Sequence, residues 1–220
     1  MAVPVLPKNA LPELNFADMK LLIFSDIHND WNALERLMAI EADYYFAAGD
    51  TVTWAKGFDA AGEILKRRGD RVLVLPGNHE SETDIHRLCE KFGLRAFHGQ
   101  TKKIDGWHIA GLGYSNHTPF KTPGEYSEAE IAIRLAAFAG LKPMILICHC
   151  PPKDTPLDRM TGGAHIGSTA VADFVRRHEP AWVFCGHVHE AEGVTATLGK
   201  TRGANVGKKG YLLDFATLQV

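Results

Sequence analysis

Five short apolar runs in this sequence are each followed by residues that can bind a metal ion. In chain order, these residues are Asp26 and His28, Asp50, Asn78 and His79, His149, and His187 and His189. Each motif alone is weak evidence. In 220 residues that include 11 histidines, for example, a His-x-His motif is expected by chance about 0.5 times. Coincidence does not readily explain the whole ordered set, in which a glycine or proline stands beside most members. The set therefore predicts one shared site.

The residue types in this set favour one kind of chemistry. Imidazole nitrogens with few carboxylates suit Mn, Fe, Zn, Co or Ni better than Ca or Mg. Without His79, seven candidate ligands remain, enough for two divalent transition-metal ions per chain. Two such ions contribute four positive charges. Asp26 and Asp50 contribute two negative charges and a bridging hydroxide contributes one more, so the centre has a formal charge of +1 and would attract a phosphate. The site is therefore expected to act on phosphate esters.

The apolar runs before these residues alternate with segments of helical period, which is typical of an α/β fold built around sheets. Runs typical of strands lie at Lys20 to Ser25, Tyr44 to Ala48, Val72 to Leu75, Met144 to Cys148 and Trp182 to Cys185. In α/β folds, ligands bind beyond the carboxyl ends of the strands. Strands that run in the same direction would therefore bring all five groups of residues to one rim.

Local signals predict the remaining elements. Helical periodicity and Gly69 predict a helix that ends at that glycine, and Asp105-Gly106 predicts a hairpin turn. Three further helices are expected after cap residues, reaching about residues 91, 139 and 179. Their expected caps are Ser81, Ser127 with Glu130 in a capping box, and Ser168 or Thr169.

The composition is that of a globular protein, and the length allows one large domain or two small ones, of which we favour one. With 45% hydrophobic and 23% charged residues, the chain is neither disordered nor of low complexity. Residues 19–220 are expected to form a single domain, and residues 1–18, which contain three prolines, are expected to form an N-terminal arm.

No apolar run approaches the roughly 20 residues that span a bilayer, so we expect no membrane partner and a cytoplasmic location. The net charge of −2 disfavours an obligate nucleic-acid partner.

Three of the four cysteines lie in apolar runs, which is typical of buried reduced thiols. Cys148, Cys150 and Cys185 also admit a zinc site as an alternative. Their Cys-x-Cys spacing differs from the usual Cys-x2-Cys knuckle, so free thiols are the favoured interpretation.

Written out in order, the motifs are Asp26-x-His28, Gly49-Asp50, Gly77-Asn78-His79-Glu80, His149 and Gly186-His187-Val188-His189. With these motifs, the chain resembles the calcineurin-like metallophosphoesterase superfamily over roughly residues 20 to 215. The resemblance implies a four-layer α-β-β-α sandwich with two mixed β-sheets face to face and helices outside. It implies one metal held by Asp26, His28 and His189, a second held by Asn78, His149 and His187, and Asp50 as the bridge between them.

Two positions depart from the pattern of that superfamily. Gly49-Asp50 continues as Thr51-Val52-Thr53, where relatives often have Asp or Arg, and this puts in doubt a partner of the ligands but no ligand. Asn29 stands where many relatives have Gly, and Asn tolerates a left-handed turn better than most residues. Function is expected to survive both departures.

The resemblance implies a phosphomonoesterase or phosphodiesterase that acts on small molecules or nucleotides through a metal-bridging hydroxide. Asp50 and His79 are the expected catalytic residues, with His79 giving a proton to the departing alkoxide. The alternative for His79 is that it only hydrogen-bonds a metal ligand or orients Asp26. The alternative functions are a nuclease of the same superfamily and a non-catalytic scaffold with this fold.

Four further residues have weaker claims on the site. Asn116, His117 and His165 lie in expected loops and are candidates for contacts with the substrate. Asn205 resembles an Asn near the end of some relatives of the superfamily.

Overall fold

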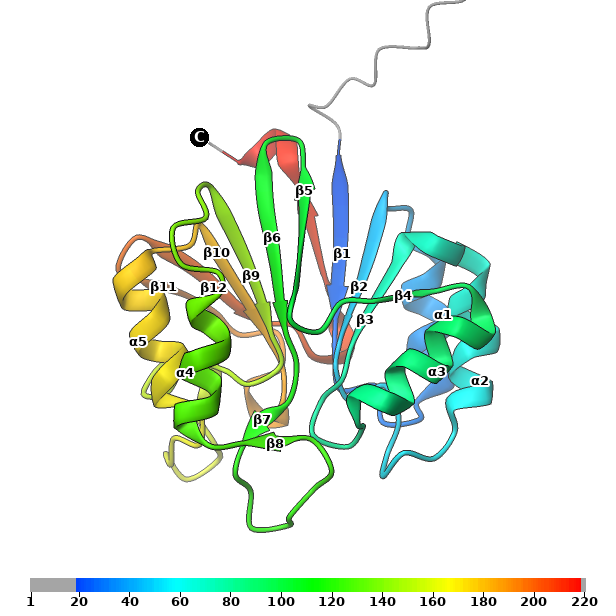
Figure 1. Cartoon of the computed structure of the whole chain (residues 1–220), viewed down its shortest axis with the longest axis horizontal. Coiled ribbons are helices and arrows are strands. Elements are labelled where there is room, and N and C mark those ends of the chain that lie inside the picture. The colour runs from blue at the N-terminus through cyan, green and yellow to red at the C-terminus, as the bar shows by residue number, and fades with distance from the viewer. Residues whose placement is uncertain (1–18, 219–220) are drawn as a thin grey trace, which may run out of the picture.

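Two β-sheets lie face to face, with helices covering both outer sides (Figure 1). The computed structural model describes residues 19–218, so the expected arm over residues 1–18 lies outside the described residues. The strand order is β13-β1-β2-β3-β4 in the first sheet and β11-β12-β10-β9-β6-β5 in the second. Both sheets contain parallel and antiparallel pairs. The expected four-layer sandwich of two mixed sheets is confirmed.

The first sheet is parallel except at one edge. Strands β1, β2, β3 and β4 pair in parallel, and β13 pairs antiparallel with β1. The bounds are Lys20–Phe24 for β1, Tyr44–Ala48 for β2, Val72–Leu75 for β3, Arg95–Ala96 for β4 and Tyr211–Asp214 for β13.

The second sheet has four parallel strands at its centre, β12, β10, β9 and β6, flanked by antiparallel β11 and β5. Its strands are β5 (Gln100–Ile104), β6 (Trp107–Leu112), β9 (Met144–Cys148), β10 (Trp182–Cys185), β11 (Thr195–Leu198) and β12 (Thr201–Asn205). A separate pair of short strands, β7 (Ser115–Asn116) and β8 (Glu125–Tyr126), lies below the two sheets in Figure 1.

The core has three layers because the strands are buried on both faces, which explains their continuous apolar runs. Along β1, Leu21 and Ile23 pack between the two sheets, whereas Leu22 and Phe24 pack under the helices of the first sheet. Helices α1 (Trp31–Ala39), α2 (Phe58–Leu65) and α3 (Glu82–Phe92) cover the first sheet, and α4 (Glu128–Ala136) and α5 (Thr169–His178) cover the second.

The expected caps are present. Ser81 and Ser127 each form a capping box with the residue three positions later, and Ser168 rather than Thr169 caps α5. Asp105 and Gly106 both have positive φ, as a tight hairpin turn between β5 and β6 requires.

Two predicted helix ends are wrong. Helix α2 ends at Leu65 and not at Gly69, because residues 66–71 tighten into a 3-10 segment whose Arg68 side chain donates to the carbonyls of Met38 and Ile40. Helix α4 ends at Ala136 and not near residue 139, since its last turns tighten toward Gly140, which has positive φ. Tertiary contacts and turn chemistry outweighed the helical pattern in both places.

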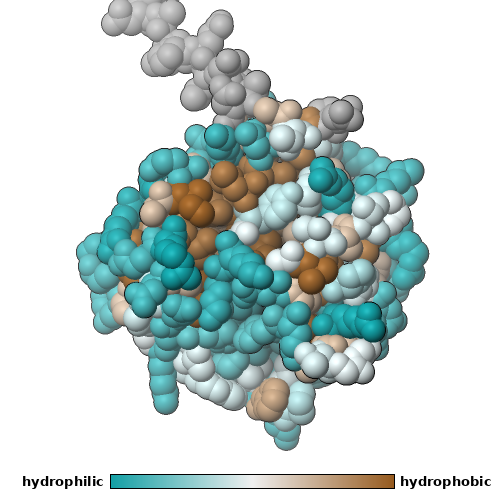
Figure 2. Space-filling view, turned by 180° about the vertical axis from the view of Figure 1, so that it is seen from behind, coloured by the Kyte–Doolittle hydropathy of each residue, from teal (hydrophilic) through white to brown (hydrophobic). Residues whose placement is uncertain are grey.

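No helix among residues 19–218 has the length and apolar character needed to cross a membrane. Seen from behind, the upper half of the molecule carries a band of apolar surface, whereas the lower half is mostly hydrophilic or intermediate (Figure 2). The lower half includes the rim toward which β1 runs in Figure 1.

Candidate metal centre

The carboxyl ends of five parallel strands meet at one rim and bring together all eight residues of the ordered set. Strands β1, β2 and β3 of the first sheet lead into Asp26 and His28, into Asp50, and into Asn78 and His79. Strands β9 and β10 of the second sheet lead into His149 and into His187 and His189. Each sheet therefore supplies one side of the site.

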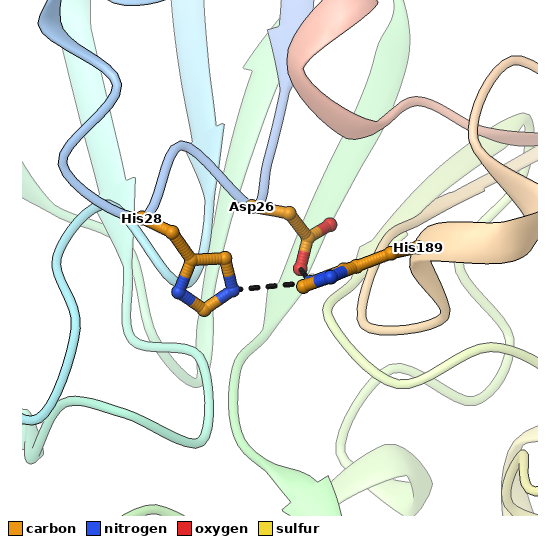
Figure 3. A group of neighbouring side chains, drawn as sticks. All are labelled: Asp26, His28 and His189. Atoms are coloured by element: carbon orange, nitrogen blue, oxygen red, sulfur yellow. Dashed lines mark hydrogen bonds and ion pairs between the residues drawn. The ribbon is translucent and has the colours of Figure 1, made fainter.

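The first group of donors consists of Asp26, His28 and His189, whose ligand atoms all lie within 4.8 Å of one another. The Nε2 atoms of His28 and His189 are 3.1 Å apart, and His189 Nε2 is 3.5 Å from Asp26 Oδ1. Figure 3 shows the rings of His28 and His189 facing each other, with the Asp26 carboxylate beside the His189 ring. Three donors that converge in this way leave one common point for a cation.

The second group consists of Asn78, His149 and His187. Asn78 Oδ1 lies 2.8 Å from His187 Nδ1 and 3.2 Å from His149 Nε2. The Asn78 amide is oriented by its Nδ2, which donates to Thr122 Oγ1 at 3.2 Å, so its oxygen faces the two rings.

Asp50 stands between the two groups. Its Oδ2 is 3.5 Å from His28 Nε2 in the first group and 3.4 Å from His149 Nε2 in the second. Its other oxygen, Oδ1, accepts the backbone N–H of His79 at 2.9 Å. One carboxylate oxygen is thus shared by both groups of donors.

These separations match those of ligands around an ion. Two atoms that each lie about 2.1 Å from one ion, at angles of about 90° to 110°, are about 3.0 to 3.4 Å apart. The donor pairs of this site are 2.8 to 3.5 Å apart. The residues present therefore fit divalent cations, in a donor set rich in nitrogen.

Hydrogen bonds outside the groups leave the inward nitrogens free. His149 Nδ1 donates to the carbonyl of Ala48 at 2.9 Å, and His28 Nδ1 hydrogen-bonds Thr53 Oγ1 at 3.2 Å. In the neutral form of each ring these bonds would place the proton on Nδ1, so each Nε2 would offer a lone pair to a cation at the centre. Thr53 belongs to the departure from the superfamily pattern, and in this fold it supplies a hydrogen-bond partner for His28.

Burial of the two aspartates disfavours their charged forms, and the surrounding groups offset this cost. Asp26 is 4% exposed and Asp50 is 2% exposed. Burial raises the pKa of Asp26, but hydrogen bonds from His189 and Ser25 and the charge of His149 outweigh it and hold the pKa well below its usual range. The pKa of Asp50 is lowered in the same way, chiefly by His149 against the effect of burial. Both carboxylates are therefore ready to bind cations.

The histidines divide into two kinds. Burial lowers the pKa of His149, but the carboxylates of Asp50 and Asp26 and the carbonyl of Ala48 outweigh burial and raise it to about 9. Burial and the nearby charge of His149 lower the pKa of His187 to about 4. Without an ion, a protonated His149 thus supplies the positive charge that the buried carboxylates need.

His79 is held by the loop after β2, the loop that also carries Asp50. Besides its N–H bond to Asp50, its carbonyl accepts the N–H of Ala55 at 2.9 Å, and its Nδ1 accepts the N–H of Trp54 at 3.2 Å. A neutral ring in this arrangement carries its proton on Nε2. His79 lines the cavity over the donors, so Nε2 is its free hydrogen-bonding atom there.

The loops at the rim carry backbone strain. Seven of the twelve non-glycine residues with positive φ in residues 19–218 lie here: Asp26, His28, Asn29, Asp50, Trp54, Ala55 and His187. Such conformations cost energy and persist only where the surroundings over-determine them. Asn29 adopts the left-handed turn expected of it, with φ of 64°.

Glu80 holds these loops together, and the sequence reasoning missed it. The side chain is fully buried, Oε2 accepts the N–H groups of Asp50 and Gly77, and Oε1 accepts that of Val52. Burial and the charge of Asp50 raise its pKa to about 8, against the effect of these N–H donors. Its place in Gly77-Asn78-His79-Glu80 was the available signal, but two of its partners lie about thirty residues earlier.

Asn205, for which the sequence gives only a weak signal, has a clear role. Its Nδ2 donates to the carbonyls of Leu157, Gly186 and Val188, at 3.0 to 3.2 Å. It thereby positions the segment that carries His187 and His189.

The three loop residues proposed for substrate contacts lie in different places. Asn116 and His117 line a cavity of about 310 Å³ above the donors. Asn116 also ties two loops together, since its Nδ2 donates to the carbonyls of Ile166 and Gly167. His165 lines a neighbouring hollow instead and hydrogen-bonds Asp158 at 2.6 Å.

The zinc alternative for the cysteines finds no support. All four cysteines are free and buried, and no three of them gather as a ligand group within residues 19–218. Burial raises the pKa of Cys150 to about 12, which keeps this thiol protonated and unsuited to a cation.

Comparison with known proteins agrees with this architecture. The calcineurin-like phosphoesterase family profile matches residues 19–191. The uncharacterized protein MJ1162 of Methanocaldococcus jannaschii is 31% identical over 202 residues, which cover 89% of this chain and 91% of that protein.

Solved structures share the fold at lower identity. The protein TT1561 of Thermus thermophilus superposes with a TM-score of 0.66 at 18% identity, over 90% of this chain and 99% of that one. The phosphopantetheinyl hydrolase of Mycobacterium tuberculosis superposes with a TM-score of 0.63 at 19% identity, over 87% and 89% of the two chains. A dimetal phosphatase from Danio rerio gives 0.59 at 12% identity, over 86% and 87%.

Replacing Glu80 by Gln should lower the free energy of unfolding by about 1–3 kcal/mol, the cost of a buried N–H without a partner. Both carboxylate oxygens accept N–H groups, so the amide nitrogen of Gln must face a donor whichever way it is turned. Urea unfolding above pH 8, where Glu80 is ionised, measures the change, and a chelator removes metal effects. Glu90→Gln, on the exposed side of α3, is the matched control, and equal stability of the two variants would contradict this role for Glu80.

Proposed function

The chain belongs to the calcineurin-like phosphoesterase family, and on that basis we propose that it hydrolyses phosphate esters of small molecules at a centre of two divalent transition-metal ions. The family is one of metal-dependent enzymes, and the residue types and burial of the rim suit metal binding. The observation that carries the proposal of two ions is the position of Asp50 Oδ2 within 3.5 Å of a donor in each group.

In this proposal, Asp26, His28 and His189 hold one ion, Asn78, His149 and His187 hold the other, and Asp50 bridges the two. Mn, Fe, Zn, Co and Ni all suit these donors. When bound, the ions supply an activated water and neutralise charge on the phosphate. Hydrolysis forms one P–O bond from water and breaks the ester P–O bond, and the departing oxygen takes a proton.

His79 supplies the group that meets the departing oxygen. Its ring is fixed by the Trp54 N–H, so Nε2 is the atom that can donate. It lies with His28 and Asp50 in a group of potential ligands, yet neither donor group needs it for completion. We therefore keep His79 as a proton donor to the leaving group.

The alternatives are less well supported. A nuclease needs cationic contacts to phosphates along its substrate, and within residues 19–218 no Lys or Arg lines the cavity above the donors. A non-catalytic scaffold does not require a full set of seven donors with compensated charges. Small phosphate esters are therefore the favoured substrates.

The proposal is tested with protein stripped of metal and reloaded with each candidate ion. Activity is measured against monoesters, linear diesters and 2′,3′- and 3′,5′-cyclic nucleotides. We expect chelation to abolish hydrolysis and reloading to restore it. Full activity in metal-free protein, or one ion per chain at saturation, would contradict the proposal.

Replacing Asp50 by Asn should weaken both ions by about tenfold or more, because one carboxylate serves both groups. Asp26→Asn should weaken one ion and leave the other. Elemental analysis and calorimetric titration of the two variants separate these patterns. Loss of a single ion in Asp50→Asn would rule out the bridge.

Metal affinity should rise as the pH is raised from 6 toward 9. The pKa of His149 is raised to about 9 in the ion-free protein, so the ring is protonated below that pH and must lose a proton to bind metal. One displaced proton gives up to about a tenfold gain in affinity per pH unit. Chelator competition at several pH values measures it, with the exposed His86→Gln as control. Occupancy and activity should fall together as the pH drops below about 9, and an affinity that ignores pH would contradict these ligands.

Replacing His79 by Ala should retain both ions and lower kcat/KM by about 10²- to 10⁴-fold for esters of alkyl alcohols. For p-nitrophenyl esters the loss should be much smaller, since that leaving group departs readily as an anion. The measurement is kcat/KM across leaving groups of graded basicity, with metal content checked each time. Equal losses across the series would leave His79 as an orienting or charge-stabilising group.

A further inference from the structure

Exposed large apolar side chains are few in this protein, and most of them gather at the rim. Within residues 19–218 they are Trp54, Phe120, Ile133, Ile166 and Leu212. Phe120 and Ile166 line the cavity above the donors, and the Trp54 ring lies 5.3 Å from that of His79 between centroids. Seen from behind, this end of the molecule is otherwise mostly hydrophilic (Figure 2). Apolar side chains concentrated beside a cavity mark a binding surface.

The cavity has a polar floor and partly apolar walls. The floor is formed by His79 and by five of the metal-type donors: His28, Asp50, Asn78, His187 and His189. One wall comes from the loop between β7 and β8, with Pro119 and Phe120, and the other from the loop between β9 and α5, with Met160 and Ile166. Phe120 is 73% exposed in this arrangement. A group seated between the walls would remove its ring from water.

The charges of the walls exclude most anionic groups. No Lys or Arg lines this cavity in the part of the chain that the structure describes, and the wall contains the carboxylate of Glu190. Arg159 lines the neighbouring hollow, which shares Met160 and Glu190 with the cavity. A second phosphate or a carboxylate on the substrate would therefore find no cation between these walls.

We infer that the organic group of the substrate is uncharged and apolar, an aryl or alkyl group seated between Phe120 and the pair Met160 and Ile166, and that the substrate carries a single phosphate. The inference rests on the proposed function, which places the phosphate over the donors. The cavity of about 310 Å³ is at the small end of the range of small-molecule sites. In this inference, the residues of the floor carry out the reaction, and the apolar residues of the walls determine which ester binds.

The test compares phenyl and 2-naphthyl esters, each as the monophosphate and as the methyl diester. The two aryl oxygens have similar basicity, so a difference in kcat/KM reports on the walls and not on the leaving group. Each buried methylene is worth on the order of fourfold, and we expect the naphthyl ester to be favoured about tenfold in whichever ester class is hydrolysed. An aryl ester with a second phosphate should be poorer than the phenyl ester.

Phe120→Ala should reduce the naphthyl preference to about twofold while metal content stays unchanged. Ile133→Ala is the matched control, because Ile133 is also 73% exposed but lies on α4 and does not line the cavity. An undiminished preference in Phe120→Ala, or no preference in the wild type, would overturn the inference. So would a best substrate with two phosphates whose turnover depends on Arg159.

Binding of aryl phosphonates, which cannot be hydrolysed as esters, separates this inference from the proposed function. Calorimetry of the metal-loaded protein should show that 2-naphthylphosphonate binds more tightly than phenylphosphonate, and that Phe120→Ala removes the difference. If neither ester is hydrolysed with any metal but this binding pattern holds, the proposed function fails and the apolar subsite stands. If the esters are hydrolysed and the phosphonates bind equally, the subsite fails alone.

Discussion

The burial of two carboxylates side by side is the constraint on which the rest of this structure depends. Asp26 and Asp50 are almost wholly removed from water, and two such charges in a low-dielectric region are tolerated only when positive or donor groups face them. Asp26 receives the N–H of His187, the hydroxyl of Ser25 and the His189 ring nearby. Asp50 receives the N–H of His79 and lies between His28 and His149. The same demand for positive charge suits the rim to a cation.

The groups that compensate the buried carboxylates come from both sheets. The first sheet contributes both aspartates, and the second contributes His149, His187 and His189. Bonds cross between them at the floor of the site, from the N–H of His187 to Asp26 and from His149 Nδ1 to the carbonyl of Ala48. The core between the sheets is apolar and holds them together without specifying their alignment through directed bonds. The hydrogen bonds between the sheets at the rim fix that alignment.

Much of the fold and the chemical character of the site were accessible from the sequence, because strands buried on both faces give continuous apolar runs and the residues after them are short-range signals. The cap at Ser81 and the turn at Asp105-Gly106 were equally local. Glu80 was not accessible, since its meaning depends on N–H groups that fold back from Asp50 and Val52. The end of α2 depended on Arg68 reaching α1, and the position of His165 depended on Asp158. Contacts beyond the local pattern decide each of these features.

The walls of the cavity are less constrained than its floor, yet one chain of hydrogen bonds links the two. The Asn78 amide donates to Thr122, and the Thr122 hydroxyl donates to Glu125 at 2.6 Å. Glu125 also accepts the hydroxyl of Thr118, two residues before Phe120. The loop that presents Phe120 is therefore fastened to the residue whose amide oxygen faces His149 and His187. These bonds connect the loop that presents Phe120 to the orientation of the Asn78 amide, so displacing the loop would disturb the bond that directs the Asn78 oxygen toward the two histidines.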